Sequence, residues 1–100
     1  MTDKQLDQLG RVLRILTDST RLRIIWLLQA QGEVTVTDIC SSLEVEQTKI
    51  STQLGKMAQL NLVKARRDGH WMYYSLVDPQ ATEELMGRLR QTSSSAVGRR

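Results

Sequence analysis

The sequence predicts a mainly α-helical domain with one small β-hairpin, in the element order α-α-α-α-β-β-α. Three observations lead to this prediction. Apolar residues recur at helical spacing as far as about residue 60, and again after residue 79. An Asp-Gly pair separates two β-prone runs, and short polar stretches stand between the helical repeats.

The first two helices are separated by a capping segment. The first helix is predicted over about residues 3–16, where four leucines recur three or four positions apart. Residues 17–20 can cap a second helix, because their side-chain oxygens accept the first unbonded backbone amides. Gly32 is expected to end this helix as its C-cap. Its inward-facing residues are predicted to be Leu22, Ile25, Trp26 and Leu28.

A helix-turn-helix is predicted next. The third helix begins near Thr35 or Val36 and ends near Leu43, and residues 43–46 form a turn. The fourth helix covers about residues 47–60, with Ile50, Leu54 and Met57 on its inner face. Two short helices joined by three or four residues are typical of this motif.

A hairpin and a final helix complete the prediction. Residues 62–67 and 70–76 read as strands on either side of Asp68-Gly69, a pair that favours a tight hairpin turn. Pro79 suits the first position of a last helix that extends to about Arg90. The order is that of a winged helix-turn-helix, in which the hairpin is the wing.

The predicted domain covers residues 1–91, with its first and last helices available for dimerisation. Residues 92–100 are rich in serine and charge and have little to bury. We therefore expect a disordered tail over residues 92–100.

Positive charge is concentrated in the middle of the chain. The 100 residues carry 14 Lys/Arg and 11 Asp/Glu, for a net charge of +3. Residues 47–77 have five bases against one acid, whereas residues 1–46 have five bases against seven acids. This distribution favours a polyanionic partner, although a solvated charged face would also account for the charge alone.

Several other classes of protein are not expected. A single cysteine excludes an intrachain disulfide and a cysteine-rich zinc site, which favours the reducing cytoplasm. The N-terminus has no apolar stretch typical of a signal peptide, and the strongly apolar run 24–28 is too short to span a membrane. No Ser/His/Asp, Cys/His or paired-carboxylate constellation indicates an enzyme, and no cofactor is expected.

Residues 12–76 resemble the ArsR/SmtB family of bacterial transcriptional repressors. The resemblance is carried by L-T-D-S-T-R-L-R-I-I-W-L-L at 16–28, by S-T-Q-L-G-K-M at 51–57 followed by Leu62-Val63, and by R-R-D-G-H-W-M-Y-Y-S-L at 66–76. It implies a homodimeric, sequence-specific repressor whose two-fold symmetry matches an inverted-repeat operator in double-stranded DNA.

The chain departs from the family's metal-sensing motifs. One branch uses E-x-C-x-C-D at the start of the third helix, where this chain has Thr35 and Thr37 in place of the two thiolates. Another branch uses two histidines on the last helix, whereas the single histidine here is His70 in the hairpin. The expectation is a repressor that is not metal-responsive and has no metal ligands.

The site residues follow from the pattern and the resemblance together. The recognition helix is expected to bring Gln47, Thr48, Lys49, Ser51, Thr52, Gln53 and Lys56 to the major groove. The wing residues Arg66, Arg67, Gly69 and His70 are expected at phosphates or the minor groove. Dimerisation is assigned to Leu6, Leu9, Leu13, Leu16, Leu85, Met86 and Leu89.

Two alternatives remain open from the sequence. Cys40 is either a small buried apolar residue or the thiol of a redox-responsive repressor, paired with the same residue of a second subunit. The winged helix could also serve protein–protein contacts, which the basic segment 47–77 disfavours. The expected partners are double-stranded DNA and a second copy of the chain, with no membrane and with an unidentified small-molecule or redox effector left open.

Overall fold

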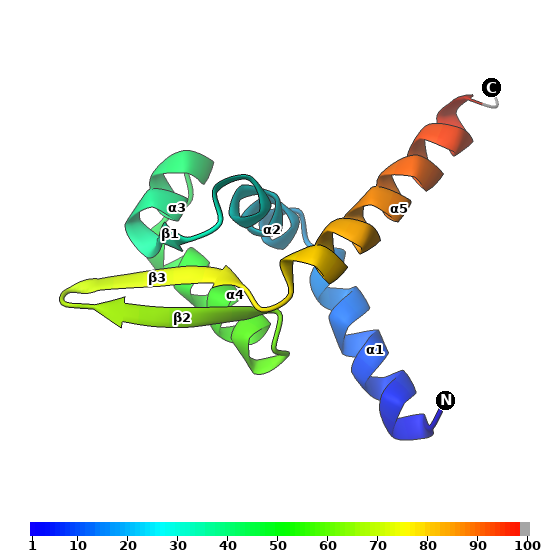
Figure 1. The fold of residues 1–100 in the computed structure, drawn as a ribbon, viewed down its shortest axis with the longest axis horizontal. Helices are drawn as coiled ribbons and strands as arrows, with labels where there is room; N and C mark the ends of the chain where they lie inside the picture. The colour runs from blue at the N-terminus through cyan, green and yellow to red at the C-terminus, as the bar shows by residue number, and fades with distance from the viewer. Residues whose placement is uncertain (99–100) are drawn as a thin grey trace.

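The computed structural model describes residues 1–98, and the side chains of all of these except Ile15 and residues 92–98. The elements are α1 (Asp3–Leu16), α2 (Ser19–Gln31), β1 (Val34–Thr35), α3 (Val36–Leu43), α4 (Gln47–Gln59), β2 (Val63–Asp68), β3 (Trp71–Leu76) and α5 (Pro79–Gly98). In Figure 1, α2, α3, α4 and the sheet form the body, and α1 and α5 extend away on the side opposite the hairpin tip. The predicted winged helix-turn-helix is confirmed.

The strands of residues 1–98 form one antiparallel sheet in the order β1-β3-β2. β2 and β3 are the predicted hairpin, with Val63 opposite Leu76 and a turn at Gly69, whose φ is 62°. The sequence prediction missed β1, because a strand of two residues is too short to show a periodic pattern. Its pairing of Val34 with Tyr74 holds the start of α3 against the wing.

The core is aliphatic and lies where α2, the helix-turn-helix (α3 and α4) and the sheet meet. Its buried apolar residues are Ile24, Ile25, Leu27, Leu28, Val34, Ile39, Ile50, Leu54, Met57, Val63 and Leu76. The prediction that Trp26 faces inward is wrong, because this side chain is 63% exposed. The α2 residues on both sides of Trp26 are buried, so the helix turns a large aromatic ring toward solvent.

The helix ends follow the predicted capping chemistry at α2. The Asp18 carboxylate accepts from the backbone amides of Thr20 (2.9 Å) and Arg21 (3.2 Å). Gly32 adopts φ 84° as the C-cap, and its amide donates to the carbonyl of Leu28 at 2.8 Å. The first and last turns of α2 are therefore fixed by local contacts that the sequence already specified.

The last helix is longer than predicted. α5 runs to Gly98, past the end near Arg90, and it includes residues 92–98, for which the sequence predicted disorder. No proline or glycine stands between Thr92 and Val97 to stop the helix. The remainder of the expected tail, residues 99–100, lies outside the described residues. The single domain over residues 1–91 stays a prediction.

The turn of the helix-turn-helix contains a strained residue. Glu44 is the C-cap of α3 with φ 56° and ψ 45°, a left-handed conformation that costs an L-residue about 1–2 kcal/mol. We expect Glu44→Gly to raise the free energy of unfolding by about 1 kcal/mol, part of the relief being lost to the greater chain entropy of glycine. Thermal unfolding at fixed protein concentration measures this effect. Glu84→Gly, inside α5, should instead lower stability by about 1 kcal/mol, and an unchanged or lower melting temperature for Glu44→Gly would contradict the account.

Candidate nucleic-acid interface

The outer face of α4 is polar and exposed. Ile50, Leu54 and Met57 fix the inner face of the helix in the core. The predicted DNA-contacting residues that are exposed on α4 are Gln47, Thr48, Lys49, Ser51, Thr52 and Lys56. The Thr52 hydroxyl donates to the Thr48 carbonyl at 2.9 Å, so its donor is engaged within the helix. Small polar side chains on an exposed helix face suit entry into a major groove.

Gln53 does not share this exposure. It is 9% exposed, and its side-chain oxygen accepts a hydrogen bond from the Arg21 guanidinium on α2. The sequence prediction that Gln53 reads bases is therefore corrected: this amide ties α4 to α2. Helical spacing alone could not show the difference, because Gln53 lies at the edge of the buried face, where the neighbouring helix decides its exposure.

The structure brings the start of α4 next to the wing. Gln47 and Ser51 line a cavity of about 290 Å³ together with His70 and Trp71. Residues at the start of α3 and of β3 also line it, so the cavity joins the two parts of the predicted site that the sequence could only treat separately. Polar groups from the helix and the hairpin thus face one common space.

The two wing arginines differ in their surroundings. The Arg66 guanidinium forms a bidentate ion pair with Glu33, with Nε to Oε2 at 2.9 Å and Nη2 to Oε1 at 2.8 Å. It also lies 4.6 Å from the centre of the Tyr73 ring, and its Nη1 is 4.0 Å from Asp68. Arg67 forms no ion pair with any residue from 1 to 98. Arg66 therefore holds the wing to the body, and Arg67 is the arginine available to an outside ligand.

The Glu33–Arg66 pair makes the stability of the fold decrease as the pH falls into the acid range. The hydrogen bond from Arg66 lowers the pKa of Glu33 below its ordinary value, and the Arg66 charge adds to the effect. A carboxyl whose pKa is lower in the folded chain stabilises fully above its unfolded pKa, and this stabilisation is lost as the pH falls through the folded value. We expect Glu33→Gln to lower the melting temperature at pH 7 and to converge with the parent chain as the pH falls from 7 through the lowered pKa of Glu33. A melting-temperature difference that is constant over this range would contradict the pairing.

The leucines predicted at a dimer interface fall into two groups. Leu6, Leu9 and Leu13 of α1 are 51%, 43% and 49% exposed. On α5, Leu85 and Leu89 are also exposed. Two members of the predicted set, Leu16 and Met86, are partly buried and pack against the core. The exposed group leaves apolar surface on both helices that extend from the body.

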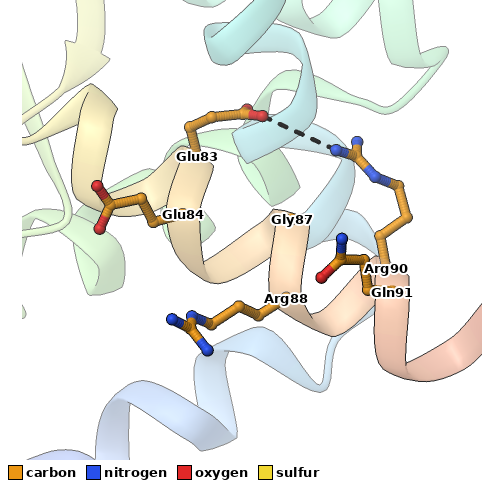
Figure 2. A pocket seen from close by; sticks show the side chains of 6 residues that line it. All are labelled: Glu83, Glu84, Gly87, Arg88, Arg90 and Gln91. Carbon is orange, nitrogen blue, oxygen red and sulfur yellow. Dashed lines mark ion pairs between the residues drawn. The ribbon is translucent and has the colours of Figure 1, made fainter.

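A hollow beside α5 is lined, among the residues whose side chains the structure describes, by this helix alone. It measures about 660 Å³ and is lined by Glu83, Glu84, Gly87, Arg88, Arg90 and Gln91. Figure 2 shows the Glu83–Arg90 ion pair, at 3.8 Å, on one side and the Arg88 side chain on the side of α1. One helix cannot close such a hollow, so it remains an open surface of α5.

Thr35, one of the two threonines found where the resembled family has thiolates, caps a helix in this structure. The Thr35 hydroxyl is buried and accepts from the Asp38 amide at 3.1 Å, which caps α3. Cys40 is half-buried and packs against the core. Among the described residues there is no group of three or more His, Cys, Asp or Glu side chains placed to hold a metal ion. In the same part of the chain, no helix is long and apolar enough to cross a membrane.

Comparison with known proteins gives consistent matches. The family model "Bacterial regulatory protein, arsR family" matches residues 18–65. The arsenical resistance operon repressor of Escherichia coli K12 is 39% identical over 66% of this chain and 56% of its own length. The CadC-homologue cadmium resistance regulator of Staphylococcus aureus is 30% identical over 89% of this chain and 74% of its own.

Among solved structures, the homodimeric winged helix-turn-helix DNA-binding domain Mb0332 of Mycobacterium bovis is similar over the whole chain. It has a TM-score of 0.83 at 28% identity and covers 100% of this chain and 94% of its own. By contrast, the match to the Escherichia coli relative spans little more than half of that protein's length.

Proposed function

Since this chain belongs to the ArsR family of bacterial regulatory proteins, and is a winged helix-turn-helix DNA-binding transcriptional regulator, we propose that it is a homodimeric repressor of an inverted-repeat operator. The similar proteins are regulators of transcription, and this chain is not an enzyme. We also propose that it does not sense metal ions through the motifs known in the family.

One observation carries the DNA-binding part of the proposal. Gln47 and Ser51 of the recognition helix α4 share one exposed cavity with His70 of the wing. The amide and hydroxyl can bond base edges, while the wing beside them supplies the unpaired cation Arg67 for a phosphate. Residues 47–77, which contain both elements, carry five bases and one acid. Base reading and phosphate attraction are thus supported on the same side of the domain.

Two observations support a homodimer that pairs α1 and α5 with the same helices of a second copy. Leu6, Leu9 and Leu13 expose an apolar stripe on α1, and the hollow on α5 lacks an opposite wall. The similar Mycobacterium bovis domain is homodimeric, and several relatives are named repressors. A two-fold dimer would present two recognition helices to two half-sites.

The absence of metal sensing is proposed from the residues that replace the ligands. Thr35 and Thr37 offer hydroxyls where soft thiolates would be required, and the Thr35 hydroxyl caps α3. His70, the single histidine of the chain, lies in the wing and not on α5. Cys40 packs against the core, which supports a structural role for its thiol.

The proposal is tested by selecting bound duplexes from random DNA and measuring their affinity by fluorescence anisotropy. We expect an inverted repeat to be enriched and Arg67→Gln to weaken binding to selected and random duplexes alike, with a salt slope smaller in magnitude by about 1 per protomer. Arg66→Gln is the matched variant, and its salt slope should change less because Glu33 already pairs with Arg66. Recovery of no duplex above random sequence would refute sequence-specific repression, and equal salt slopes for the two variants would refute the wing assignment.

A further inference from the structure

Four cationic side chains from three helices surround another cavity, which includes no residue of the wing. Arg11 and Arg14 of α1, Arg21 of α2 and Lys56 of α4 line this space of about 270 Å³, and Gln59 and Leu60 complete it. Among the described residues, no carboxylate lines the cavity. Within residues 1–98, none of the four cations takes part in an ion pair. We call this cluster the basic pocket.

Arg21 is held in place inside the basic pocket. Its Nε donates to the side-chain oxygen of the buried Gln53, and its Nη1 lies 3.5 Å from the carbonyl oxygen of Arg14. A guanidinium has five N–H donors in a fixed plane, so these contacts leave donors for an outside acceptor. The buried amide of Gln53 thus orients a cation at the meeting point of α1, α2 and α4.

The grouping of like charges needs an explanation outside the chain. Cations that share a small cavity repel one another, and the repulsion is relieved only by salt or by an anion. Asp18, the N-cap of α2, accepts from the amides of Thr20 and Arg21 and interacts electrostatically with Arg21, but it does not line the pocket and forms no ion pair with a described cation. Arginine forks and a lysine ammonium around one space match the oxygens of a phosphate group.

The basic pocket adjoins the surface proposed to face DNA. Lys56 lies seven residues after Lys49, so both project from one flank of α4, beside its exposed polar face. On α1, Arg11 is two residues from Leu9 and from Leu13, which places it about 200° around the helix from either leucine. A dimer formed through the leucines would therefore leave Arg11 uncovered.

We propose that the basic pocket binds phosphodiester groups of the DNA backbone next to the segment read by α4. This inference rests on the proposed function and extends the DNA contact from the helix-turn-helix and the wing to α1 and α2. The pocket contributes affinity without sequence preference, because its ligand is the repeating backbone.

The test compares two double variants that have the same net charge. Arg11→Gln/Arg14→Gln removes two cations of the basic pocket, both exposed and outside the helix-turn-helix. Lys4→Gln/Arg23→Gln removes two exposed cations elsewhere: Lys4 is about 10 Å from Arg11 along α1, and Arg23 is about 200° around α2 from Arg21. Circular dichroism and sedimentation establish that both variants keep the fold and the oligomeric state of the parent chain.

Binding of the selected operator and of a random duplex is then measured against salt concentration. For the pocket variant, we expect affinity to fall by a similar factor on both duplexes and the salt slope to decrease by about 1–2 per protomer. The control variant should keep the salt slope of the parent chain, apart from the small long-range effect of the two charges that it lacks. In ethylation interference, ethylation of the phosphates bound by the pocket should inhibit binding of the parent chain but not binding of the pocket variant.

Two results would overturn the inference. The first is a parent-like salt slope in the pocket variant while the parent chain binds its operator, which leaves the proposed function intact and removes only the pocket. The second is saturable binding of inorganic phosphate at constant ionic strength that is lost in the pocket variant but leaves the DNA affinity of the parent chain unchanged, which would reassign the pocket to a free anion. Failure of the parent chain to bind DNA would instead refute the proposed function.

Discussion

Replacing Leu9 and Leu13 with glutamate is expected to convert the proposed dimer into a folded monomer and to lower operator affinity by roughly two to four orders of magnitude. Both side chains are nearly half exposed on α1, so the substitutions remove little from the core of one protomer. In a two-fold dimer they would bring four carboxylates into an apolar contact, where unpaired charge is costly. The monomer would also lose the linkage between two half-sites.

Sedimentation at micromolar concentration and anisotropy with the selected operator measure the two effects. The control is Lys4→Glu, which makes the same change in net charge from another face of α1 and should remain dimeric. Far-ultraviolet circular dichroism shows whether the Leu9→Glu/Leu13→Glu chain keeps its helices. A variant that remains a dimer would refute the pairing through α1.

The second large effect concerns base recognition. Gln47→Ala is expected to relax the preference for one base pair in each half-site, at a cost of about 1–3 kcal/mol per half-site for the preferred base. Gln47 is exposed at the start of α4 and shares its cavity with Ser51 and His70, so its amide is available to a base edge. Removing the amide also leaves the proposed phosphate contacts of the wing in place.

Binding to a set of operators with single base-pair changes measures this effect. We expect the Gln47→Ala profile to flatten at one symmetric pair of positions and to stay unchanged elsewhere. Gln80→Ala, an exposed amide in the first turn of α5, is the matched control and should keep the full profile. If Gln47→Ala weakened all operators equally, Gln47 would be a backbone contact, and another residue would read the base.

The sequence determined the elements whose signals are local. Asp18 and Gly32 bound α2 by contacts with residues no more than four positions away, so their roles could be predicted without a partner element. The Asp68-Gly69 turn and the β-prone runs around it specified the wing in the same way. The apolar spacing of α4 likewise separated Ile50, Leu54 and Met57 from the polar face.

Elements with weak local signals were predicted less well. The two residues of β1 form a strand only because β3 is beside them, and no sequence window of that length has a period. Trp26 was assigned to the core because it belongs to an apolar run, yet the orientation of α2 turns it outward. The direction in which a large apolar residue faces depends on which neighbours are available to cover it.

By itself, the sequence determined a winged helix-turn-helix with a basic central third, because caps, turns and apolar periods act between residues close in the chain. Only the tertiary structure decided which polar groups are left for a ligand. It pairs Arg66 with Glu33 across 33 positions, bonds Gln53 to Arg21 across 32, and gathers cations of α1, α2 and α4 into one pocket. Partners so far apart in sequence meet through the packing of the core. The partner, rather than the residue type, determines whether a polar or charged side chain is bonded within the fold or is left for the proposed contact with DNA.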